Sequence, residues 1–382
     1  MAWNPEPTVT IGGTDYTGKS LNGVSINYGR TNVWEQARAS FATVELINLT
    51  DAIETFNLND EVIIKVQNSS GIDKTVFTGN LSDITNLSAF SSSNVKVSIH
   101  RISALGPFAK MSRAITGGSW PKEYDDDRMD RIFTAAGVPV DVVDTPGIYE
   151  FTSINHTAQD CYNLAAYYST MALGYIYENT LGKVGFANES RRTNEADTNG
   201  YFQIPSGSIL TAGITSSKTF TDIANDIELE YKANATVSGT NATSITNYGI
   251  RAMDIMTELE QMGQAQDQLD RYLALRSIPR TSLSQFSLQL DVDALSTSQR
   301  NTLIELYMGK PIEIQGLPAA IYNGTYKGFV EGWNLTINRS QASLTINSTE
   351  AAYSLVPERW QDVLATTRWS DVVSTIQWQN YE

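Results

Sequence analysis

One thiol and one imidazole lie close enough in the sequence to suggest a nucleophile. His156 stands five residues before Cys161, which is the only cysteine in the 382-residue chain. A histidine base can activate a cysteine thiol for covalent catalysis. However, Cys161 falls on the apolar stripe of a predicted helix, where a free cysteine usually packs as a small hydrophobic side chain. We therefore expect a core position for Cys161. For His100, the other histidine, we expect a surface position or a hydrogen-bonded one on a predicted strand.

Asp125, Asp126, Asp127 and Asp130 form an acidic run that could suggest a metal site. A calcium loop alternates its acidic residues and contains a glycine and a terminal glutamate, which this run lacks. Carboxylates at a helix N-terminus gain from the helix dipole and from capping. We therefore expect a helix over residues 126–137, with Asp127 as its cap, and no metal site.

Glu178, Glu313 and Glu331 flank predicted strands and are candidates for the carboxylate pair of a glycosidase. Nothing in their spacing selects two of them. The sequence has no Walker loop, no glycine-rich dinucleotide turn after a strand, no HExxH motif and no GxSxG motif. With only two histidines in addition, this favours a protein that is not an enzyme and binds no cofactor.

The composition is that of a soluble globular protein with an acidic surface. Apolar residues make up 41% and charged residues 18%, and the net charge is −15 at pH 7. This charge argues against nucleic-acid binding, because phosphates would be repelled. No run approaches the roughly 18 apolar residues of a membrane-spanning helix, and the first residues lack the pattern of a secretion signal. We expect synthesis in a cytoplasm and no membrane span.

The first hundred residues alternate apolar and polar side chains with the period of two that is typical of strands. The segments are SLNGVSINYG, RASFATVELINL, DEVIIKVQNSS, KTVFTGNLSDI and NVKVSIHRISAL, and turn residues separate them. Five such strands without an intervening helix predict a small antiparallel barrel or sandwich.

The pattern changes after residue 110. Helices are predicted over 126–137 and 157–174, the second with Thr157 as N-cap, and a hairpin follows around Leu181-Gly182. A third unit contains a long helix over 254–277 and several strands. The sequence thus predicts a mainly β, α+β protein: a β-barrel domain over 1–110, a peripheral α+β domain over 111–212, a second antiparallel β-barrel domain over 213–350, and an extended C-terminal arm over 351–382.

Several short motifs occur in a fixed order along the chain. Gly29-Arg30 closes VSINYGR, Asn48 lies at the end of the next strand, and Phe77-x-Gly79 stands in a return strand. A helix then leads into the hairpin of AQDCYNLAAYYSTMALGYIYENTLGKVGF. Taken singly, each motif is short, so their order carries the information.

The order continues to the end of the third unit. NDIELEY is followed by TSITNYGIRAMDI, which contains Gly249 and Arg251, and GFVEGWNLTINRSQASLTIN supplies two closing strands. Over almost the whole chain, this succession resembles the minor tail proteins of long-tailed bacteriophages. One departure is NLTDA, which stands where the family usually has an Asn-x-Asp-Gly turn.

The resemblance implies a hub protein of a phage tail tip or baseplate, similar in fold to the central hubs of contractile baseplates. Three copies would ring the tail axis, with two barrel domains per chain. The tail tube or a distal tail protein would lie above, and tip, spike or fibre proteins below, so the protein would be located in the virion. Gly29 would occupy a turn or bulge with unusual backbone angles, and Arg30 would form a structural ion pair.

Two other functions remain open on the sequence. One is a tail-associated protein that binds carbohydrate or hydrolyses the cell wall, which predicts an aromatic cleft with paired carboxylates. The other is the hub of a phage-derived bacterial injection machine.

The C-terminus carries Trp360, Trp369 and Trp378 at intervals of nine residues. In a helix, a step of nine residues amounts to a net half turn, and in a strand an odd step leads to the opposite face. The three tryptophans therefore cannot all lie on the same face of a single helix or strand. Burying them contributes at most about 10 kcal/mol, whereas ordering the last residues costs roughly 35 kcal/mol. We therefore expect the segment to dock on a larger surface, in its own chain or in a neighbour.

Overall fold

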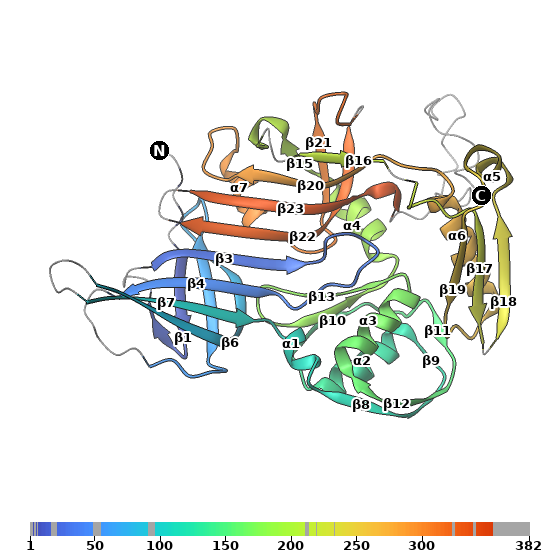
Figure 1. The fold of residues 1–382 in the computed structure, drawn as a ribbon, viewed down its shortest axis with the longest axis horizontal. Helices are drawn as coiled ribbons and strands as arrows, with labels where there is room; N and C mark the ends of the chain where they lie inside the picture. The colour runs from blue at the N-terminus through green and yellow to red at the C-terminus, as the bar shows by residue number, and fades with distance from the viewer. Residues whose placement is uncertain are drawn as a thin grey trace.

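The computed structural model describes residues 3, 5, 7–16, 21–48, 55–90, 96–210, 214–218, 220–232, 234–322, 325–338 and 341–353. Within these ranges the chain is mainly β, with seven α-helices and large antiparallel sheets (Figure 1). The prediction of a mainly β, α+β protein is therefore confirmed. Of the helices described, none has the length and apolar character needed to cross a membrane.

A thirteen-stranded sheet contains strands from both ends of the described chain, and Figure 1 shows the blue N-terminal strands beside the orange and red C-terminal ones. Its main order is β16-β20-β23-β22-β3-β4-β7-β6-β5-β1-β2, and β21 pairs with both β22 and β15. The N-terminal strands are β1 (Pro7–Ile11), β2 (Thr14–Asp15), β3 (Leu21–Gly29), β4 (Phe41–Asn48), β5 (Glu61–Gln67), β6 (Asp73–Phe90) and β7 (Lys96–Leu105). The later strands are β15 (Phe202–Pro205), β16 (Thr215–Ser217), β20 (Ser282–Gln289), β21 (Pro311–Gln315), β22 (Tyr326–Asn338) and β23 (Ala342–Glu350).

The alternating pattern explains the N-terminal strands. Along β4, every second residue is buried, and Ala42, Val44 and Leu46 point into the core. All five predicted N-terminal strand segments correspond to strands, β3 to β7.

The sheet joins the first and third predicted units through β3 and β22. These strands pair antiparallel from Gly29 opposite Gly332 to Gly23 opposite Asn338. The buried apolar residues of the described chain accordingly form one large cluster that runs through all three units. The four domain boundaries stay a prediction.

The α+β unit contains the two predicted helices and small sheets (Figure 1). Its elements are α1 (Phe108–Met111), β8 (Ile115–Trp120), β9 (Glu123–Tyr124), α2 (Asp125–Ala136), β10 (Val140–Val143), β11 (Glu150–Phe151), β12 (Ile154–Asp160), α3 (Cys161–Met171), β13 (Tyr175–Glu178), β14 (Val184–Ala187) and α4 (Arg191–Asn199). The hairpin of β13 and β14 turns at Leu181-Gly182, as predicted.

The start of α3 differs from the prediction. Asp160 is the N-cap, and its side chain accepts a hydrogen bond from the backbone N–H of Asn163 at 2.8 Å. Thr157, the predicted cap, lies in β12, which pairs with β8. Pairing with β8 thus extends the strand to Asp160, which shortens the helix.

The third unit adds a three-stranded sheet covered by a helix (Figure 1). Its elements are β17 (Asp226–Tyr231), β18 (Ala235–Thr240), α5 (Ala242–Tyr248), β19 (Ala252–Met256), α6 (Met262–Arg276) and, farther along the chain, α7 (Thr297–Ile304). Short 3-10 turns occur at Ser206–Ser208 and Ala351–Tyr353. The predicted helix over 254–277 is too long, because Ala252–Met256 pairs in parallel with β17 as a strand.

Candidate functional site

The end of β3 is shaped by a glycine that no other residue could replace without a shift of the backbone. Gly29 has a φ of +80°. A Cβ at this position would lie 2.2 Å from the carbonyl oxygen of Glu331 and 2.7 Å from the Cα of Gly332. The pairing of β22 with β23 shifts register between Val330 and Gly332, which marks an irregularity in β22 at the same place. Both the backbone angle and the close strand approach therefore require glycine.

Arg30 follows this glycine and enters a buried ion cluster. Its Nε donates to Oε2 of Glu331 at 2.7 Å, and Nη2 of Arg192, from α4, donates to the same oxygen at 2.8 Å. Nη1 of Arg30 also donates to the backbone carbonyl of Glu35 at 2.6 Å. The Tyr175 ring lies 5.4 Å from the Arg30 guanidinium carbon and 4.9 Å from that of Arg192. We call Arg30, Tyr175, Arg192 and Glu331 the arginine–glutamate cluster.

The electrostatics of the cluster depend on its two cations. Burial alone would raise the pKa of Glu331, but Arg192 and Arg30 outweigh burial and hold that pKa below its ordinary value. Glu331 is completely buried, so its charge is compensated by the arginines and not by water. The cluster therefore joins β3, β22 and α4, which lie far apart in the sequence.

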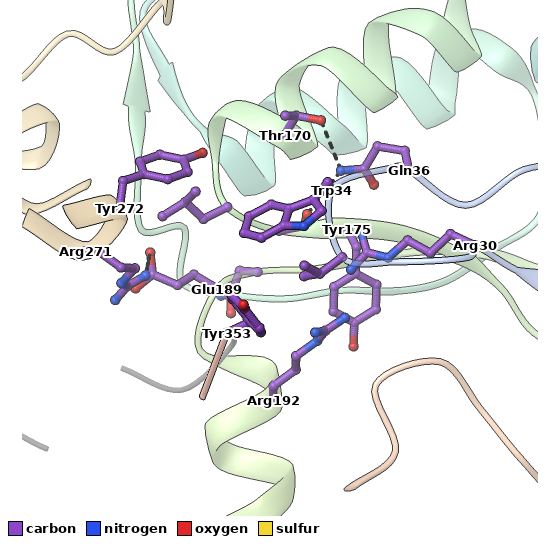
Figure 2. A pocket seen from close by; sticks show the side chains of 14 residues that line it. Arg30, Trp34, Gln36, Thr170, Tyr175, Glu189, Arg192, Arg271, Tyr272 and Tyr353 are labelled. Atoms are coloured by element: carbon purple, nitrogen blue, oxygen red, sulfur yellow. Dashed lines mark hydrogen bonds and ion pairs between the residues drawn. The ribbon is translucent and has the colours of Figure 1, made fainter. Parts of the chain in front are cut away.

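A small cleft of about 120 Å³ adjoins the cluster, and Figure 2 shows the side chains around it. We call it the aromatic cleft. Trp34 is 43% exposed and lies between the Arg276 guanidinium, 4.3 Å from its ring, and the Tyr353 ring, which meets it edge-on at 5.7 Å. Across the cleft, Arg271 of α6 forms an ion pair with Glu189. The lining residues come from the loop after β3, the end of α3, the start of α4, α6 and the last described turn.

The three candidate carboxylates have separate partners. Glu178 is buried and accepts hydrogen bonds from the backbone N–H groups of Ser40, at 2.6 Å, and Phe108. Glu313 lies half-buried on β21 and accepts from the side chain of Gln315. Glu331 belongs to the arginine–glutamate cluster. This arrangement gives no support for the acid and nucleophile pair of a glycosidase.

Glu178 is nevertheless unusual, because burial raises its pKa to about 7. Hydrogen bonds from Ser40 and Phe108 act in the opposite direction but are outweighed. The folded protein therefore binds this proton more tightly than the unfolded chain does. The contribution of Glu178 to the free energy of unfolding is largest below pH 4.5 and falls as the pH rises towards 7.

The histidines and the cysteine have structural surroundings. His100 is buried on β7, with Nδ1 2.7 Å from Oδ1 of Asn86. His156 contacts the Tyr168 hydroxyl, and burial lowers its pKa. Cys161 is fully buried at the start of α3, and burial raises the pKa of its thiol. The expected core position of Cys161 is confirmed, and a raised thiol pKa is the opposite of nucleophile activation.

The acidic run begins α2, one residue earlier than predicted. The N-cap is Tyr124, and Asp127 lies in the first turn, so the prediction of Asp127 as cap is wrong. Asp125 and Asp126 instead accept hydrogen bonds from the backbone N–H groups of residues 147–149, the segment just before β11. Burial raises the pKa of Asp125 to about 7. Among the described residues, no group of three His, Cys, Asp or Glu side chains is placed to hold a metal ion.

The other residues singled out from the sequence lie at separate places. Asn48 is buried at the end of β4, and a Cβ on Gly79 in β6 would lie 2.5 Å from the carbonyl oxygen of Leu105. Gly249 ends α5 with a φ of +74°, and Arg251 follows it. Trp360, Trp369 and Trp378 lie outside the described residues. Of the described residues in this group, Gly29 and Arg30 share one place, and Gly249 and Arg251 share another.

Two residues that hold these sites together, Arg192 and Asn225, were not predicted from the sequence. Arg192 completes the arginine–glutamate cluster. Asn225 is fully buried; its side-chain NH₂ donates to the carbonyl of Gly249 at 2.9 Å, and its side-chain oxygen accepts from the N–H of Arg251 at 2.7 Å. One signal was present. Glu331 interrupts the apolar stretch GFVEGW, and a charge within a buried strand implies a buried counter-charge.

No protein-family model matches the sequence, and no curated protein matches it. Solved structures do match in fold. The 43 kDa tail protein of prophage MuSo2 from Shewanella oneidensis gives a TM-score of 0.63 at 11% identity, over 91% of this chain and 99% of that one. A tail protein from Neisseria meningitidis MC58 gives a TM-score of 0.64 at 8% identity, over 92% and 98%. The chain has the fold of phage tail proteins.

A protein of a bacterial secretion system also matches this chain in fold. An E. coli component of the type VI secretion system, described as structurally similar to tail proteins of bacteriophage T4, gives a TM-score of 0.51 at 11% identity. The match covers 91% of this chain and 78% of that one. The resemblance to phage tail proteins that the sequence motifs indicated is thus confirmed for the fold.

Proposed function

We propose that this protein is a structural component of a phage tail, and that it forms a hub ring at the tail tip or baseplate. The observation that carries the proposal is the match in fold to two tail proteins over more than nine-tenths of both chains. A fold alone does not define a function, so the site must agree with it. The arginine–glutamate cluster does agree, because its charged groups are buried and paired with one another and serve to hold strands and a helix together.

In this proposal the ring contains three copies, and each chain contributes two β-barrel-like domains and a peripheral α+β domain. The tail tube or a distal tail protein binds above the ring, and tip, spike or fibre proteins bind below it. The role is mechanical and not enzymatic. The net charge of −15 agrees with a protein whose partners are other proteins and not nucleic acid.

Two measurements test the proposal. Light scattering of the purified chain at increasing concentration should give a mass three times that of the 42.1 kDa chain, alone or with a tail partner. Immunogold electron microscopy should then place the protein at the distal end of tails in particles from the same host. Purified tailed particles that lack the protein would refute the proposal, and labelling along the tube would refute the tip location.

The type VI match favours a second candidate, the hub of a phage-derived injection machine. Capsid and terminase genes beside the gene for this protein would indicate a phage. Contractile-sheath and secretion genes without capsid genes would indicate the injection machine.

A further inference from the structure

A second, wider depression lies beside the aromatic cleft, along α3. This second depression has a volume of about 590 Å³ and includes Tyr162, Tyr167, Met171 and Met256 in its lining. Gln36 and Thr170 line both depressions, and their side chains hydrogen-bond at 3.1 Å. The two depressions therefore adjoin at this pair of residues, and we call the wider one the α3 groove.

Large apolar side chains are exposed along this surface. Trp34 is 43% exposed, Tyr167 is 44% exposed and Met256 is 76% exposed. They come from the loop after β3, from α3 and from the end of β19. Apolar groups that gather from separate elements and remain exposed mark a binding surface more often than scattered ones do.

Two tyrosines of the α3 groove are held in fixed positions. The Tyr162 hydroxyl donates to the carbonyl of Ala37 at 2.9 Å, and the Tyr167 hydroxyl donates to Oε1 of Glu258 at 3.2 Å. The rings therefore need little further ordering when something binds against them. Methionine and aromatic side chains together suit aromatic occupants, because thioethers make favourable contacts with rings.

The described chain ends beside this surface. Tyr353, its last residue, packs edge-on against Trp34 at 5.7 Å and lines the aromatic cleft (Figure 2). The sequence that continues from it contains Trp360, Trp369 and Trp378, which are three of the seven tryptophans. The seven residues from Tyr353 to Trp360 can span about 23 Å when extended. The C-terminal segment therefore leaves the described chain at the cleft that adjoins the α3 groove.

We propose that residues 354–382 bind in the α3 groove of the same chain, with tryptophan side chains against Tyr167 and Met256. Aspartates stand two residues after Trp360 and Trp369, at positions 362 and 371. Arg38, which lines the groove with a side chain 81% exposed and lies 3.9 Å from the Glu35 carboxylate, offers them a cation. The proposal is independent of tail assembly, since it concerns one chain.

A photo-crosslinking experiment on the full chain tests the contact directly. Tyr167 is replaced by p-benzoylphenylalanine, the purified protein is irradiated, and cross-linked peptides are identified by mass spectrometry. We expect cross-links to peptides within 354–382 in a product of monomer mass. Cross-links only to other segments, a product only of dimer mass, or no cross-link would each overturn the proposal.

Hydrogen exchange of the full chain supplies a second readout with matched variants. In the wild type, amides within 354–382 should exchange slowly, and Tyr167→Asp should accelerate their exchange by about tenfold or more, since it places a charge against the bound tryptophans. Tyr167→Phe should retain the protection. Tyr124→Asp is the control, because Tyr124 is also 44% exposed but lies outside the groove. Equal exchange in Tyr167→Asp and Tyr124→Asp would overturn the proposal, as would fast exchange of the segment in the wild type.

Discussion

Replacing Glu331 by glutamine removes the charge of the arginine–glutamate cluster while almost keeping its shape. Glu331 is fully buried, and one of its oxygens accepts from Arg30 at 2.7 Å and from Arg192 at 2.8 Å. An amide oxygen can still accept hydrogen bonds, but two buried guanidinium groups would then lose the carboxylate that both of them bind. The variant therefore tests the charge and not the volume.

The expected loss follows from the cost of buried unpaired charge. Breaking one buried ion pair costs about 3–5 kcal/mol, because the remaining ion has lost its water and gained nothing in return. Here a single carboxylate compensates two arginines, so we expect Glu331→Gln to lower the free energy of unfolding by about 4 kcal/mol or more. Changing Arg192 to leucine in addition should recover part of the loss, because it removes one of the two buried cations that Glu331 bound.

Urea unfolding followed by circular dichroism measures the effect. Glu313→Gln is the control, since Glu313 is only half-buried on the neighbouring β21 and has no ion pair among the described residues; its loss should stay below about 0.5 kcal/mol. If Glu331→Gln loses less than about 1 kcal/mol with an unchanged denaturant slope, the cluster does not stabilise the fold in the way argued.

Three further predictions concern single residues. Gly29→Ala should cost about 3 kcal/mol in the same assay, whereas Gly13→Ala, with a φ of +81° but open space around it, should cost about 1 kcal/mol; equal losses would show that the approach of β22 is unimportant. Glu178→Gln should weaken the decline in unfolding free energy between pH 4.5 and 7, to which the Glu178 pKa of about 7 contributes on the order of 3 kcal/mol; an unchanged pH dependence would contradict the burial argument. Cys161 should react with a thiol reagent only after unfolding, because its raised pKa and full burial protect it, and fast reaction in native buffer would disprove this.

Local patterns in the sequence predicted local structure well. The period-two alternation predicted β3 to β7, because one face of these strands packs on the core. The stretch GFVEGWNLTINRSQASLTIN contains the two predicted closing strands, β22 and β23. The errors occurred where pairing with a distant strand decided the outcome. Residues 252–256 form a strand beside β17 and not the first turns of α6. Residues 157–160 belong to β12, which pairs with β8, and not to the first turn of α3.

The candidate site shows the same limit more strongly. Arg30 and Glu331 stand 301 positions apart, and nothing in the spacing of either residue points to the other. Their contact exists because β3 and β22 pair, and their close approach requires Gly29 opposite Gly332. The motif Gly29-Arg30 could be recognised from the sequence, but the need for a glycine and an arginine at these positions comes from the partner strand β22. A glycine lets β22 approach, the arginine beside it then meets a buried glutamate on that strand, and Arg192 compensates the same carboxylate from α4. A substitution at any of these positions should therefore weaken the junction between the N-terminal and C-terminal strands.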